Sequence, residues 1–110
     1  MFVTSDGSAY TRFKRALEVG NLTLVRAAAA ELPHVSIHDA LRVCLLLRDD
    51  DDPALYERAA VRWTGRFALE AHGVDLEAIQ TAAAALNALP EAPGDAMETL
   101  AALCAAYPVT

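Results

Sequence analysis

Apolar positions recur at helical spacing along most of the chain, separated by short breaks that carry Gly, Pro or capping side chains. An apolar residue at every third or fourth position is typical of a helix with one face in a core. The breaks therefore predict six helices, over residues 8–19, 22–32, 37–48, 53–72, 76–89 and 96–107.

Local signals support each predicted boundary. Gly20 and Gly73 stand where a helix can end in a left-handed turn, a conformation that glycine adopts without steric cost. Short polar side chains stand where helices begin, and they can accept hydrogen bonds from the free N–H groups of the first turn. These expected N-caps are Asn21, Ser36, Asp52, Asp75 and Asp95, the last paired with Glu98 as a capping box.

The composition favours an all-α fold. Ala occupies 24 and Leu 15 of the 110 positions, and both residues are strong helix formers. A chain of this length fits one domain. We therefore expect a single helical domain over residues 1–110, a compact bundle of about six helices, with residues 1–7 disordered.

The two halves of the chain contain similar segments. Residues 16–18 match residues 68–70, an Ala run at 27–30 matches another at 82–85, and residues 39–41 resemble 95–97. These matches predict two similar three-helix halves, as a duplication produces, with chance matching in an Ala-rich chain as the alternative. The third predicted helix of each half is apolar on nearly all sides. Such a helix lies in a core or at an interface, so we predict a homodimer in which a second copy of the chain covers one of these helices.

Charge is distributed unevenly along the chain. The net charge is −6, and residues 67–110 hold six acidic and no basic side chains. Nucleic acids and anionic membranes select basic surfaces, so neither is expected as a partner. The chain shows no secretory signal pattern, and the uncharged stretch at residues 78–90 is shorter than the about 20 residues of a membrane span, so we expect a cytoplasmic protein.

Three arginines form the most specific feature of the sequence. Arg58, Arg62 and Arg66 recur at every fourth position of one predicted helix and share a face, with Trp63 at its flank. Guanidinium groups bind carboxylates through paired hydrogen bonds, and Trp and Arg are common at binding hot spots. These four residues are the candidate partner-binding surface, for an acidic segment. The alternative is a solvated face whose arginines pair with nearby acids, such as Arg66 with Glu70.

Other chemistry-bearing residues have structural explanations. The four aspartates at 49–52 suit a helix cap better than a metal site, because they lack the alternation of a calcium loop. His38 and Asp39 are expected to be exposed in a first helical turn, and Cys44 and Cys104 to be buried thiols. The sequence shows no catalytic or phosphate-binding motif, which predicts a non-enzyme without cofactor or metal.

Residues 13–22, 36–41 and 56–63 resemble a group of small uncharacterised helical proteins from GC-rich bacteria. This resemblance implies a bacterial all-helical protein and brings no activity with it. The helix–Gly–Asn–Leu–helix opening is also similar to helical-hairpin repeat proteins, a likeness that concerns architecture only.

The leading hypothesis for function is a small protein-interaction domain, non-catalytic and self-associating, whose protein partner the residues do not identify. One alternative is a small ligand bound between the two halves, since helical bundles form such sites. A DNA-associated regulator is the weaker alternative. Its recognition helix would be residues 37–48, which are too apolar to contact bases.

Overall fold

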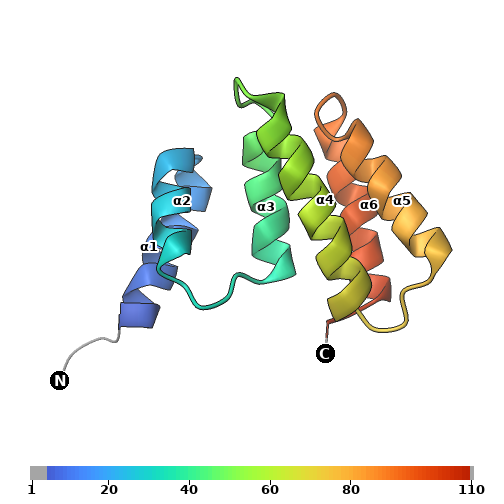
Figure 1. Cartoon of the computed structure of the whole chain (residues 1–110), viewed down its shortest axis with the longest axis horizontal. Helices are drawn as coiled ribbons and strands as arrows, with labels where there is room; N and C mark the ends of the chain where they lie inside the picture. The colour runs from blue at the N-terminus through green and yellow to red at the C-terminus, as the bar shows by residue number, and fades with distance from the viewer. Residues whose placement is uncertain (1–4, 110) are drawn as a thin grey trace. The chain divides into compact units, whose positions relative to one another are not determined.

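The structure, a computed structural model, describes residues 5–109. The described residues form six α-helices and no strand, so the predicted all-α fold is confirmed (Figure 1). The helices are α1 (Ser5–Val19), α2 (Leu22–Ala30), α3 (Ile37–Leu47), α4 (Pro53–Glu70), α5 (Leu76–Ala88) and α6 (Pro93–Ala106).

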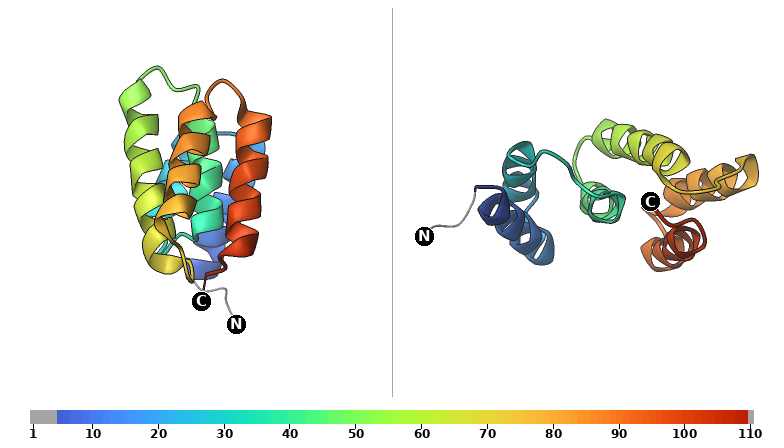
Figure 2. Two further views of the ribbon diagram at one scale, coloured as in Figure 1. Left: turned by 90° about the vertical axis from the view of Figure 1, so that its right-hand side faces the viewer. Right: turned by 90° about the horizontal axis from the view of Figure 1, so that it is seen from below.

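The chain divides into two compact units, over residues 1–46 and 47–110. The first unit contains α1, α2 and all but the last residue of α3, and the second contains α4, α5 and α6, as predicted for two three-helix halves. In the first unit α1 packs along α2, and in the second α5 packs against both α4 and α6 (Figure 2). Of the segment 1–7 expected to be disordered, residues 5–7 belong to α1, and residues 1–4 lie outside the described residues.

The matching segments of the two halves occupy different environments. Leu17 is buried at 5% exposure, whereas its counterpart Leu69 is 88% exposed. Asp39 is buried, and its counterpart Asp95 is exposed. The two halves therefore bury these matching segments differently, and the duplication stays a prediction.

Most helix ends follow the predicted local signals. At the end of α1, Gly20 has φ +80°, and its N–H donates to the Leu17 carbonyl at 3.2 Å while that of Asn21 donates to Ala16 at 3.0 Å. This pair of bonds defines a Schellman motif, in which the left-handed residue is glycine. The predicted N-cap bonds run from the N–H groups of Leu24, Asp39, Ala54 and Ala78 to the side chains of Asn21, Ser36, Asp52 and Asp75.

The predicted boundaries are wrong at the start of α1, which begins at Ser5, at the end of α2, which ends at Ala30, at α6 and at the end of α4. α6 begins at Pro93, because proline suits the first helical turn, and Asp95 lies inside that turn instead of capping it. α4 ends at Glu70, two residues early. The N–H of His72 instead donates to the Pro108 carbonyl at 2.9 Å, and this contact ends the helical hydrogen bonding.

A buried carboxylate links α1 to α3 in the first unit. Asp39 is 6% exposed, so its predicted exposure is wrong. Its carboxylate accepts hydrogen bonds from Lys14 Nζ at 3.0 Å and from the Tyr10 hydroxyl at 3.2 Å. The hydrogen bond to Asp39 raises the pKa of Lys14 above its ordinary value, because it stabilises the ammonium form.

Aromatic side chains line the buried face of α4. Trp63 is 1% exposed, and its indole stacks on the ring of Phe67 with centroids 5.3 Å apart. The Tyr107 ring meets Phe67 edge-on at 6.2 Å. On α5 the buried residues include Ala82 and Ala85, whose small side chains let neighbouring helix axes approach closely.

The two helices expected to be apolar on all sides differ in exposure. On α3 only His38 is exposed. α6 buries Leu100 and Cys104 on one side and exposes Asp95, Glu98 and four alanines on the other. Because those exposed apolar groups are single methyls, α6 offers little surface to a second copy, and the homodimer stays a prediction.

Candidate partner-binding surface

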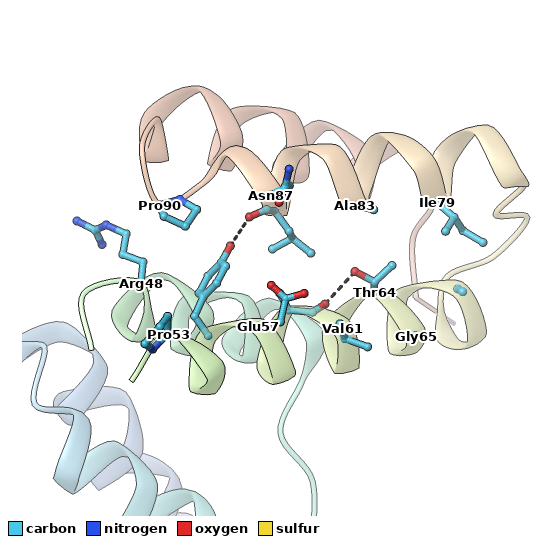
Figure 3. Close-up of a pocket in the computed structure, with 14 residues that line it drawn as sticks. Arg48, Pro53, Glu57, Val61, Thr64, Gly65, Ile79, Ala83, Asn87 and Pro90 are labelled. Atoms are coloured by element: carbon cyan, nitrogen blue, oxygen red, sulfur yellow. Dashed lines mark hydrogen bonds between the residues drawn. The ribbon is translucent and has the colours of Figure 1, made fainter. Parts of the chain in front are cut away.

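A groove of about 520 Å³ runs between α4 and α5 of the second unit. Figure 3 shows residues of α4 facing residues of α5 across it, with Val61 and Thr64 on one side and Ala83 and Ile79 on the other. The lining residues are Arg48, Pro53, Tyr56, Glu57, Ala60, Val61, Thr64, Gly65, Ala68, Ile79, Ala83, Leu86, Asn87 and Pro90.

Small side chains on both helices leave the groove open. Ala60, Gly65 and Ala68 of α4 and Ala83 of α5 line it, and none carries an atom beyond Cβ. At its Pro53 end the Tyr56 hydroxyl donates to the Leu86 carbonyl at 2.5 Å, so that hydroxyl is already used. The remaining lining is mainly aliphatic, which makes the groove an apolar trough.

Gly65 is the least expected residue of the groove. It lies inside α4 and is exposed, and a glycine in a helix interior costs stability relative to alanine. Apart from its chain neighbours and the backbone of its own helix, a Cβ at this position would meet no heavy atom within 4 Å. Packing inside the chain therefore does not require glycine here, and its use leaves the helix backbone accessible from the groove.

We expect Gly65→Ala to raise the free energy of unfolding by about 0.5–1 kcal/mol, because alanine is the better helix former and meets open space. Urea denaturation of both proteins measures the difference. Gly73→Ala is the matched control: φ is +79° there, a conformation that strains alanine, so that variant should be less stable. A loss of stability in Gly65→Ala would contradict an open groove.

Of the four predicted binding residues, Arg58 and Arg62 lie on the outer face of α4. Both are exposed, and within the described residues neither forms an ion pair or a side-chain hydrogen bond. Val61, next to them and 63% exposed, belongs to the groove lining. Neither arginine is among the lining residues, and by helical spacing both lie on the side of α4 that adjoins Val61 and Gly65.

The other two predicted residues do not join this surface. Arg66 donates to Glu70 through Nε at 2.6 Å and Nη2 at 3.2 Å, so its charge is paired within the helix, as the alternative interpretation held. The prediction that Trp63 anchors a partner at the surface is wrong, because its side chain is buried. The helical spacing of Tyr56, Trp63 and Phe67 marks the core-facing stripe, a signal that could have identified its burial.

Sequence reasoning missed the exposed aliphatic residues beside the arginines. Val61, Gly65 and Leu69 recur at every fourth position and form a stripe parallel to Arg58 and Arg62. Leu69 and Leu76, on either side of the α4–α5 connection, are also strongly exposed. Large exposed aliphatic side chains that gather on one face mark an interaction surface more often than isolated ones do.

The charge around the groove is one-sided. The second unit holds four arginines and 11 acidic side chains. Against this acidic background Arg58 and Arg62 form a basic edge along α4. The charged residues of the groove lining itself are Glu57 and Arg48, and Arg48 pairs with Asp49 at 3.5 Å. The α5 wall, which includes Ile79 and Asn87, carries no charge.

A second groove, of about 320 Å³, lies between α1 and α2 of the first unit. The exposed side chains of Val19 and Leu24 line it. An ion pair between Arg12 Nη2 and Glu31 Oε1, at 2.8 Å, joins its two helices. Its lining also includes the exposed Arg15 of α1, so this groove too combines apolar walls with a basic side chain, but its volume is smaller than that of the α4–α5 groove.

The polar clusters singled out in the sequence have structural roles. Asp52 caps α4, and the Asp50 carboxylate accepts a hydrogen bond from the N–H of Asp52 at 2.9 Å. These two aspartates therefore stabilise the start of α4. Within the described residues, no three His, Cys, Asp or Glu side chains gather to hold a metal ion. Both cysteines are buried, and burial raises the pKa of the Cys104 thiol.

Comparison of the chain with protein-family models, curated proteins and solved structures finds no match. The resemblance to helical proteins of GC-rich bacteria thus stays a prediction. Among the described helices, none has the length and apolar character to cross a membrane.

Proposed function

We propose that this protein is a non-catalytic protein-interaction module that binds its partner through the α4–α5 surface, meaning the α4–α5 groove together with Arg58 and Arg62. The observation that carries the proposal is an apolar groove open beside two exposed arginines that have no partner within the described residues. Stable interfaces combine an apolar centre with a polar rim, and arginine is enriched among their strongest contacts.

The proposal revises the interpretation drawn from the sequence. The proposal keeps an acidic partner that binds Arg58 and Arg62. It replaces Trp63, as the apolar contact, with the groove lined by Val61, Ile79 and Ala83. Self-association remains a competing proposal, in which a second copy occupies the same surface.

A small-molecule ligand is the second candidate function, supported by the groove volume of about 520 Å³. Pockets for small ligands span roughly 300–1,000 Å³ and place a few convergent polar groups among apolar walls. Here the Tyr56 hydroxyl is already bonded to Leu86, which leaves few polar groups to orient a small ligand. A protein partner therefore fits the groove better.

Replacement of Ala83 by leucine tests the proposed function, because it fills the groove from the α5 side. Ala83 is exposed, so the melting temperature should stay within about 2 °C of the wild type while partner binding is lost. The measurement is quantitative affinity purification of the tagged full chain from its native host. Ala84→Leu is the control, since Ala84 is also exposed on α5 but lies outside this groove.

We expect wild type and Ala84→Leu to retain the same proteins, with at least one absent from Ala83→Leu. Identical sets from all three proteins would contradict the proposal. A metabolite that shifts the melting temperature of wild type and Ala84→Leu, but not of Ala83→Leu, would favour the small-ligand function instead.

A further inference from the structure

We infer that the α4–α5 surface receives an amphipathic helix of another protein, one that carries acidic residues along a single edge of its apolar stripe. This inference rests on the proposed function and adds the chemistry of the partner. It follows from the length of the groove, the nature of its walls and the position of its charges.

The shape of the groove fits a helix. Its lining extends from Pro53 to Ala68 on α4, which corresponds to about 22 Å at the rise of an α-helix and accommodates about four turns of a guest helix. A guest strand would need unpaired backbone groups along an edge, and both walls are helices whose backbone groups bond internally.

The groove lining allows close approach of a helix. Gly65 leaves its backbone open on the groove side, and Ala68 and Ala83 add only methyl groups. Val61 and Ile79 supply larger apolar contacts on opposite walls. A guest helix with a stripe of apolar residues three and four positions apart would bury that stripe in the trough.

The charges select an acidic edge on the guest. Arg58 and Arg62 are one helical turn apart and lie only on the α4 side, while the α5 wall is uncharged. A guest helix lying along the groove would match them with carboxylates four residues apart on its α4-facing edge. The rest of the unit is strongly acidic, so these two arginines are the attractive positions for such a partner.

A second copy of this chain is less suited to the same surface. Symmetric pairing places the same patch on both sides of the interface. Each copy would then offer its partner Arg58, Arg62 and the lining residue Arg48 against the single acid Glu57, so like charges would meet.

The test is a parallel selection of displayed helical peptides. The library contains 18-residue peptides with a fixed Leu and Ala stripe and random residues on both flanks. It is selected against the wild-type full chain and against the double variant Arg58→Glu/Arg62→Glu, which alters only exposed side chains. Circular dichroism melting verifies that both proteins are folded.

We expect wild type to enrich Asp or Glu at positions four apart on one flank only. These peptides should bind the double variant about tenfold more weakly or worse, because attraction becomes repulsion. The double variant should enrich Lys or Arg at the same positions. Ala83→Leu should bind neither group.

Three results would overturn the inference. Peptides that bind wild type and the double variant equally, yet fail on Ala83→Leu, would refute the acidic edge and leave the proposed function intact. A wild-type dimer in analytical ultracentrifugation that Ala83→Leu dissociates would identify a second copy as the occupant. Absence of any enriched peptide that depends on Ala83 would contradict the proposed function as well.

Discussion

Replacing Trp63 with alanine is expected to lower the free energy of unfolding by about 3–5 kcal/mol, the usual cost of removing a large buried aromatic side chain. The indole is 1% exposed and stacks on Phe67, so its removal leaves a cavity and ends an aromatic contact. Chemical denaturation followed by far-UV circular dichroism measures the change.

Val61→Ala on the same helix is the control for this prediction. Val61 is 63% exposed, so its truncation should change the free energy of unfolding by no more than about 0.5 kcal/mol. If Trp63→Ala costs as little as Val61→Ala, the indole lies at the surface, and the aromatic anchor predicted from the sequence is restored.

Asp39→Ala is expected to lower the free energy of unfolding by about 2–3 kcal/mol. The carboxylate accepts hydrogen bonds from Lys14 and Tyr10, and bonds to charged groups contribute more than neutral ones. The cost stays below that of a fully buried pair, because the Lys14 side chain is 33% exposed and can turn toward solvent. Glu31→Ala is the control, since its pair with Arg12 is exposed and should contribute less than 1 kcal/mol.

The same ion pair predicts how stability changes at alkaline pH. The pKa of Lys14 is raised in the folded protein by its hydrogen bond to Asp39. Folding then favours the protonated amine, so this stabilisation is complete below the ordinary lysine pKa of about 10.4 and is lost as the pH rises through the raised value. The difference in free energy of unfolding between wild type and Lys14→Met should therefore shrink over that range. A constant difference would contradict the predicted linkage.

The candidate binding surface was only partly predictable from the sequence. The spacing of Arg58 and Arg62 placed them on one helix face, and both are exposed as that spacing suggested. Arg66 and Trp63 lie on the same helix but do not belong to the binding surface. Arg66 pairs with Glu70, and Trp63 faces the core. The groove could not be predicted, because its walls belong to two different helices and it depends on how α4 and α5 pack against each other.

The sequence by itself determined the helices and most of their ends. Gly20, Asn21, Asp52 and Asp75 act through hydrogen bonds to residues no more than five positions away, so local chemistry was sufficient to place them. The tertiary structure decided which faces are covered. It buried Asp39 by bringing Lys14 and Tyr10 of another helix to it, and it left a trough beside Gly65. Burial depends on which helix faces meet across the fold, and residues far apart in the chain decide this together.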